Sequence, residues 1–143
     1  MKIVVMDGQG GRMGALLCEK IRKNQKELPV GTELTAIGTN SAATAAMLKA
    51  GADYGATGEN PVLVACRDAD FIIGPLGILA ADSLLGEVTP AMAVAVGSSR
   101  AQKLLLPVNR CNHHVVGVQD YSLTELTEEA VQDLLSLIRE KQA

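Results

Sequence analysis

A glycine-rich segment near the start of the chain constrains the fold more than any other feature. It consists of Gly8, Gln9, Gly10, Gly11, Arg12, Met13 and Gly14. It follows the apolar run at residues 3–6 and precedes a segment whose apolar side chains recur with helical spacing. This order predicts an anion-binding turn, because the helix offers unpaired N–H groups and the positive end of its dipole. We call residues 8–14 the glycine loop.

Apolar, strand-like segments alternate with helical segments along the rest of the chain. Strands are expected at residues 2–7, 34–37, 52–57, 71–73, 104–106 and 114–118, and helices at about 12–24, 42–50, 61–66, 79–85, 90–96 and from 122 onward. This alternation predicts an α/β fold with a doubly wound, mostly parallel sheet of about six strands. The segment at 114–118 is expected to be antiparallel, because no helix separates it from the preceding strand.

Capping residues mark several helix starts. Ser41, Asn60, Thr89 and Ser122 are expected to cap their helices, and Glu125 completes a capping box with Ser122. No linker or change in composition divides the chain, so residues 1–143 are expected to form a single Rossmann-like domain.

Composition excludes several kinds of partner. The net charge is −3 and only 2% of residues are aromatic, so we expect no nucleic-acid partner, which would need a basic patch and often stacking aromatic rings. No apolar stretch is long enough to span a bilayer, and no signal peptide is recognisable, so we expect no membrane partner. Cys18, Cys66 and Cys111 are far apart and form no metal-binding spacing. A reduced, cytoplasmic protein is expected, with Cys18 and Cys66 as small core residues.

Loop residues after the expected strands gather at one edge of a parallel sheet, where open α/β sheets bind ligands. Besides the glycine loop they include Thr39, Asn40, Gly74, Pro75 and Asn109. Turns also use Gly, Asn and Pro for purely structural reasons. Together with the glycine loop, these residues form the candidate binding set for a nucleotide or dinucleotide, with NAD(P) as the leading ligand.

Two features of this edge bear on the NAD(P) hypothesis. The second expected strand ends in Gly38, Thr39 and Asn40, where dinucleotide-binding domains place an acidic residue for the adenosine ribose. Asp7 precedes the first glycine, and its carboxylate would repel a pyrophosphate unless it points away, is protonated or binds a cation. The alternative, which we favour, is that Asp7 accepts hydrogen bonds from the loop N–H groups and stabilises the turn.

The segment around Cys111 holds the candidate catalytic residues. Cys111 lies beside Arg110 and close to His113 and His114, an arrangement that suits an activated thiol with a nearby base. Adjacent histidines of a strand point to opposite faces, and their spacing matches no metal site. Glu59 is an acid–base candidate by position alone. A solvated hairpin and a surface carboxylate explain the same residues without chemistry.

The glycine loop resembles that of the dihydrodipicolinate reductases, which carry G-x-x-G-R-M-G after their first strand. The matching residues are Gly8, Gly11, Arg12, Met13 and Gly14. The likeness covers only the first strand, the loop and the first helix, and it implies contact between the loop and a pyrophosphate. It does not imply reductase activity, because the substrate domain, the histidine-rich catalytic segment and the acidic residue after the second strand are missing here.

The whole chain is similar to a family of short bacterial Rossmann-like proteins described as a domain of unknown function. Residues 7–11, 38–40, 48–52, 55–60, 74–75 and 106–112 carry this resemblance. It implies the fold and, by analogy, an NAD(P)-type domain, and it implies no established activity.

Three functions follow as hypotheses. The first is a nucleotide-binding protein that senses or carries its ligand rather than acting on it. The second is a small enzyme in which a second subunit of a homo-oligomer completes a site that uses Cys111, His113, Glu59 and Asn109. The third is an interaction protein that kept the fold and lost the ligand.

Overall fold

A parallel sheet of five strands forms the centre of the structure, a computed structural model that describes residues 1–108 and 112–143. The strand order is β3-β2-β1-β4-β5, and each strand runs parallel to its neighbours. The strands are β1 (Lys2–Asp7), β2 (Glu33–Gly38), β3 (Tyr54–Thr57), β4 (Phe71–Pro75) and β5 (Gln102–Leu106). The predicted α/β fold class is confirmed, and the strand order is consistent with a Rossmann-like fold.

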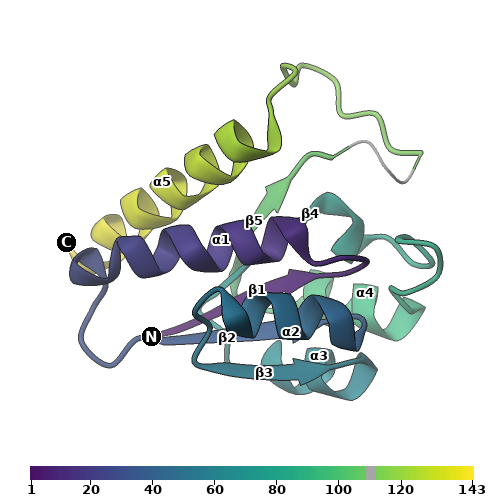
Figure 1. The fold of residues 1–143 in the computed structure, drawn as a ribbon, viewed down its shortest axis with the longest axis horizontal. Coiled ribbons are helices and arrows are strands. Elements are labelled where there is room, and N and C mark those ends of the chain that lie inside the picture. The colour runs from purple at the N-terminus through teal and green to yellow at the C-terminus, as the bar shows by residue number, and fades with distance from the viewer. Residues whose placement is uncertain (109–111) are drawn as a thin grey trace.

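Helices cover both faces of the sheet (Figure 1). One face carries α1 (Arg12–Lys23), α2 (Ser41–Lys49) and α5 (Leu123–Gln142), and the other carries α3 (Glu59–Ala65) and α4 (Pro90–Ser98). Strand β1 shows why both faces are covered. Ile3 and Val5 lie in the first core, Val4 and Met6 lie in the second, and all four are buried. A continuous apolar run is what a parallel strand between two helical layers requires. No helix in the described part of the chain is long and apolar enough to cross a membrane.

Two of the predicted elements are wrong. Residues 114–118 form no sixth strand, so the described sheet has five strands and is entirely parallel. Gly117 has φ 85°, which breaks an extended backbone, and Val116 and Val118 are exposed rather than buried on one face. The helix expected at 79–85 is replaced by a short 3-10 helix, η2 (Leu76–Leu79), and a series of turns. A second short 3-10 helix, η1 (Gln25–Glu27), follows α1.

The caps of two helices were predicted correctly, and those of two others are displaced. The Ser122 hydroxyl accepts a hydrogen bond from the Glu125 amide at 3.1 Å, and the Glu125 carboxylate accepts one from the Ser122 amide at 3.1 Å. Thr89 caps α4. Helix α2 is capped by Asn40 instead of Ser41, and Asn40 accepts from the Ala43 amide at 2.9 Å. Helix α3 begins at Glu59 after Gly58, whose φ is 97°, so the predicted Asn60 cap is wrong by two residues.

The strand order creates a crevice beside the glycine loop. Strand β1 pairs with β2 on one side and with β4 on the other. The chain leaves β1 towards α1 on one face, whereas it leaves β4 towards η2 and α4 on the opposite face. Because these connections diverge, the edge between β1 and β4 is a topological switch point, where open parallel sheets bind their ligands.

Candidate functional site

Asp7 holds the turn from β1 into α1 together. It is 7% exposed, and its carboxylate accepts hydrogen bonds from the Gly8 amide at 2.8 Å and from the Gly14 amide at 2.7 Å. The N-cap of α1 is Gly11, which has no side chain, so Asp7 supplies the acceptor that a capping side chain normally offers to the third helical amide. The positive end of the helix dipole favours this negative charge. The predicted structural role of Asp7 is therefore confirmed.

The glycines of the loop differ in the space around them. Gly11 has φ 71°, and a Cβ at this position would lie 2.6 Å from the Cα of Ala43 in α2. A Cβ at Gly14 would lie 2.8 Å from the Cβ of Asp7. In contrast, nothing lies within 4 Å of a Cβ placed on Gly10, which is exposed. Gly11 and Gly14 are thus needed for packing, whereas Gly10 leaves open space over the loop.

A carboxylate from a distant segment, Glu87, lies against the glycine loop. Its Oε1 accepts hydrogen bonds from the Gln9 amide at 2.9 Å, from Thr39 Oγ1 at 2.7 Å and from Asn40 Nδ2 at 2.7 Å. Burial raises the pKa of Glu87, but the hydrogen bonds from Thr39, Gln9 and Asn40 outweigh it and hold the pKa below its ordinary value of 4.5. Glu87 is therefore ionised at neutral pH. We call Gln9, Thr39, Asn40 and Glu87 the Glu87 cluster.

Asn40 ties the cluster to both the glycine loop and α2. Its Nδ2 also donates to the Gln9 carbonyl at 2.8 Å, and its Oδ1 accepts from the Ala43 amide. Both N–H groups of the side chain are thus used within the protein. Sequence reasoning missed Glu87 because its partners are 47, 48 and 78 residues away along the chain. One signal was available in the sequence. Two side-chain donors, Thr39 and Asn40, follow β2 without an acidic residue beside them, which indicates that their acceptor comes from another segment.

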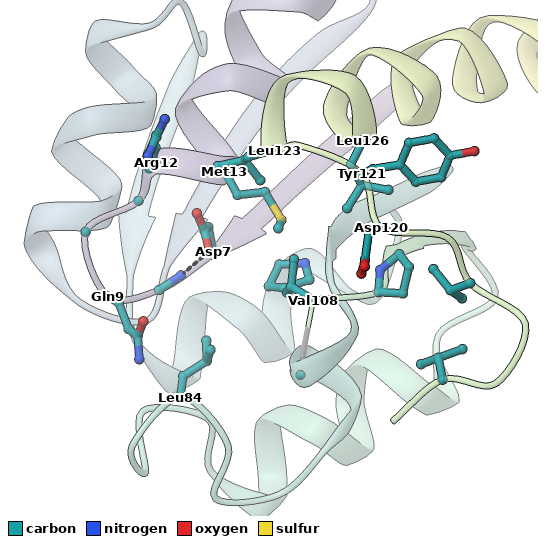
Figure 2. A pocket seen from close by; sticks show the side chains of 18 of the residues that line it. Asp7, Gln9, Arg12, Met13, Leu84, Val108, Asp120, Tyr121, Leu123 and Leu126 are labelled. Carbon is teal, nitrogen blue, oxygen red and sulfur yellow. Dashed lines mark hydrogen bonds between the residues drawn. The ribbon is translucent and has the colours of Figure 1, made fainter. Parts of the chain in front are cut away.

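A cavity of about 490 Å³ lies beside the glycine loop, towards β4 and β5 (Figure 2). The loop forms one wall. Much of the remaining lining is apolar and includes Pro75, Leu84, Val108, Val118, Leu123 and Leu126. His114, Asp120 and Tyr121, from the irregular segment that leads to α5, add polar groups. Pockets of this size and character are typical of small-molecule sites.

The structure gathers part of the candidate binding set at this cavity. The members that line it are Gly8, Gln9, Gly10, Gly11, Arg12, Met13 and Pro75. Among the described residues, Gly14, Thr39, Asn40 and Gly74 do not line it. Gly74 lies inside the sheet, where a Cβ would press on the Met6 carbonyl. Asn109 lies outside the described residues.

The candidate catalytic residues are not gathered at the cavity in the described part of the chain. Glu59 is exposed at the start of α3 and accepts a hydrogen bond from Thr89 Oγ1 at 2.6 Å. His113 is exposed and does not line the cavity, whereas its neighbour His114 does. Cys111 lies outside the described residues.

Cys18 and Cys66 are buried free thiols, as predicted. Burial raises the pKa of Cys18 to about 12 and that of Cys66 to about 11. Both therefore remain protonated at neutral pH, and a protonated thiol is a poor nucleophile. They act as small core residues rather than as reactive groups.

Fold and site together define an α/β protein in which a glycine turn at a switch point borders a cavity of small-molecule size. The chain matches the family described as "Domain of unknown function (DUF3842)" over residues 2–139, and it belongs to that family. This confirms the resemblance to a family without an assigned function. No curated protein and no solved structure matches the chain.

Proposed function

We propose that this protein binds a nucleotide, or a closely related phosphate-bearing molecule, at the glycine loop, and that it senses or carries this ligand. The observation that carries the proposal is the cavity of about 490 Å³ between the glycine loop and the ends of β4 and β5. It lies at the switch point of the strand order, which is where open α/β sheets hold their ligands. Among the dinucleotides, NAD and NADP are the leading candidates.

The start of α1 supports a phosphate as the anchoring group. The first amides of a helix have no partner within the helix, and Gly10, Arg12 and Met13 line the cavity. Gly10 allows close approach, because nothing lies within 4 Å of its missing Cβ. The exposed side chain of Arg12 adds positive charge at the same end of the helix.

The remaining lining supports an organic body attached to the phosphate. Val108, Leu123 and Leu126 are partly buried and contribute apolar surface to the cavity, which a sugar or a base can cover. Figure 2 shows Val108, Leu123 and Leu126 across the cavity from Gln9 and Arg12. A ligand with one anionic end and one weakly polar end therefore fits this arrangement.

A binding role agrees with the placement of the candidate catalytic residues that the structure describes. Glu59 and His113 lie away from the cavity lining, and burial keeps the thiols of Cys18 and Cys66 protonated. We therefore propose a sensor or carrier, in which the polar side chains of the cavity, His114, Asp120 and Tyr121, contact the ligand.

A second candidate is an interaction protein that retains the fold without a ligand. The observation that favours it is that Asp7 and Glu87 already accept hydrogen bonds from three amides of the loop, those of Gly8, Gly14 and Gln9. In that case the two carboxylates replace a bound anion and make the loop self-sufficient.

Ligand-induced stabilisation separates the two candidates. The protein is titrated with NAD(H), NADP(H), ATP, FAD and their mononucleotide parts while its melting temperature is followed. A ligand of the native state at about one hundred times its Kd adds about 2.7 kcal/mol of stability, which raises the melting temperature by several degrees.

Two substitutions provide the matched controls. Gly10→Glu places a carboxylate at the mouth of the cavity and is expected to abolish the shift, whereas Asn60→Glu places the same charge on the exposed surface of α3 and is expected to preserve it. Equal melting temperatures with and without every compound at millimolar concentration would refute the nucleotide proposal and leave the interaction protein.

A further inference from the structure

We propose that Glu87 determines the class of ligand: it closes the β2 side of the glycine loop, so that the site takes a mononucleotide and rejects a dinucleotide. This inference rests on the proposed function, because it concerns the same glycine loop and cavity. It assigns a role to a residue whose charge, position and hydrogen bonds are otherwise unexplained.

The side-chain donors at the end of β2 that could hold ligand oxygens there are engaged within the protein. In a doubly wound domain, the adenosine ribose is bound beyond this strand end. Thr39 Oγ1 donates to Glu87, and both N–H groups of Asn40 are used by Glu87 and by the Gln9 carbonyl. These donors are therefore not available to ribose hydroxyls while the Glu87 cluster is intact.

The carboxylate also interferes with a second phosphate. Glu87 Oε1 lies 2.9 Å from the Gln9 amide nitrogen, and a pyrophosphate spanning the loop towards β2 would bring its own negative charge next to it. Like charges at such a separation repel strongly in a partly buried site. A single phosphate at the start of α1, on the cavity side of the loop, avoids this repulsion.

The position of Glu87 is fixed by a packed backbone segment. Residues 80–88, which we call the strap, are closed by hydrogen bonds from the Asp82 amide to the Val88 carbonyl at 2.7 Å and from the Val88 amide to the Ser83 carbonyl at 3.2 Å. Leu84 of the strap is buried, and a Cβ on Gly8 would lie 2.8 Å from its Cδ1. The strap thus covers Gly8 and places Glu87 over the β2 side of the loop.

The strap holds a backbone that can change when its contacts are removed. Leu84 has φ 54° and Leu85 has φ 56°, a left-handed conformation that bulky residues rarely adopt. Burial of Leu84 and the hydrogen bonds of Glu87 maintain it. Without the Glu87 carboxylate, the strap loses its hydrogen bonds to Gln9, Thr39 and Asn40. The β2 side of the glycine loop then becomes accessible to a ligand.

The cavity on the opposite side of the loop leaves room for one nucleotide. It reaches from the glycine loop to Val108, Val118 and Leu126, and Thr39, Asn40 and Glu87 are not among its described lining residues. A mononucleotide can therefore place its phosphate at the start of α1 and its sugar and base in the cavity, without touching Thr39, Asn40 or Glu87.

The test compares each dinucleotide with the mononucleotides it contains. NAD is paired with AMP and nicotinamide mononucleotide, and FAD with AMP and FMN, by calorimetry on the full chain. The intact protein is expected to bind at least one mononucleotide about ten-fold or more tightly than the dinucleotide that contains it, a difference of about 1.4 kcal/mol. Glu87→Ala is expected to narrow this ratio by strengthening dinucleotide binding.

Two further variants make the outcome decisive. Glu33→Ala removes an exposed carboxylate at the opposite end of β2 and is expected to leave the ratio unchanged. Glu87→Gln keeps the size of the side chain, removes its charge and provides a folded variant if Glu87→Ala proves unstable by circular dichroism. Because the side chain keeps its size, Glu87→Gln should narrow the ratio of mononucleotide to dinucleotide affinity less than Glu87→Ala does.

The possible failures are distinct. If a dinucleotide binds the intact protein as tightly as its mononucleotide parts, or if both Glu87 variants keep the original ratio, the role of Glu87 is refuted and nucleotide binding stands. If no phosphate compound binds at all, the proposed function fails, and the role of Glu87 fails with it.

Discussion

The two sides of the glycine loop differ in construction, although both follow parallel strands at the same edge of the sheet. On the β2 side, Thr39 and Asn40 hold the carboxylate of Glu87, and the polar groups satisfy one another. On the β4–β5 side, the same loop borders a largely apolar cavity of about 490 Å³. A glycine turn of this kind can therefore be closed by internal hydrogen bonds on one side and border an open cavity on the other.

This difference separates stability from binding. Substitutions on the closed side remove internal hydrogen bonds or introduce clashes, so they should lower the free energy of unfolding. Under the proposed function, substitutions on the open side alter a surface that the ligand contacts, so they should change affinity and leave stability almost intact.

The largest difference is expected between Gly11→Ala and Gly10→Ala. The Gly11 variant forces a Cβ against Ala43 in α2 and places alanine at φ 71°, so it should lose about 3 kcal/mol of stability. The Gly10 variant meets nothing within 4 Å and should unfold like the intact protein. Urea unfolding of both variants measures the difference, and equal losses would show that the loop packs differently from the structure.

Asp7→Asn should cost about 2 kcal/mol, because a buried amide of the loop then faces an NH2 group instead of an acceptor. The amides concerned are those of Gly8 and Gly14, both bonded to Asp7 in the structure. Asp68→Asn is the matched control. Asp68 forms an exposed ion pair with Lys2, and such pairs contribute little. A stable Asp7→Asn variant would mean that the turn does not depend on this carboxylate.

The elements of the closed side could be predicted from the sequence only in part. The apolar run of β1, the helical spacing of α1 and the glycine loop are local patterns, and the structure contains all three. The structural role of Asp7 was also predictable, since its partners lie one and seven residues away. Glu87 was not predictable, because its position over the loop depends on the packing of the strap.

The open side shows a different limit of sequence patterns. Val115, Val116 and Val118 have the composition of a strand, but the left-handed Gly117 interrupts them and no neighbouring strand pairs with them in the described sheet. Apolar residues there line the cavity instead of a sheet. An apolar segment beside a cavity therefore resembles a strand in sequence, because the apolar residues of a strand and of a cavity wall are alike in composition.

Glu87→Gln should lower the free energy of unfolding by about 1 kcal/mol at pH 7. The carboxylate accepts three hydrogen bonds, but the side chain is only partly buried, so the expected loss is modest. The pKa of Glu87 is lowered in the folded protein, so the ionised carboxylate stabilises it fully above the ordinary value of 4.5. This contribution is lost as the pH falls through the lower, folded pKa. The stability difference between the variant and the intact protein should therefore shrink below pH 4.5.

A double-mutant cycle with Thr39→Val refines this test. Thr39 donates directly to Glu87, so the two substitutions should cost less together than the sum of their separate costs. Unfolding is followed by circular dichroism between pH 7 and pH 3. A constant difference over this range, or strict additivity, would contradict the ionised cluster.

The smallest effect on stability is expected from Val118→Ser on the open side. Val118 lines the cavity and is 42% exposed, so its replacement should change the free energy of unfolding by less than about 0.5 kcal/mol. Val64 in α3 is 45% exposed and is not one of the described residues that line the cavity, so Val64→Ser is the matched control.

The same variant tests ligand affinity. A ligand that covers Val118 loses apolar contact in Val118→Ser, and its Kd should rise about three- to ten-fold, corresponding to about 1 kcal/mol. Calorimetry with the tightest mononucleotide measures this rise. If the Kd were the same for both serine variants, the ligand would lie elsewhere, and the contrast between a closed and a receptive side of the loop would no longer hold.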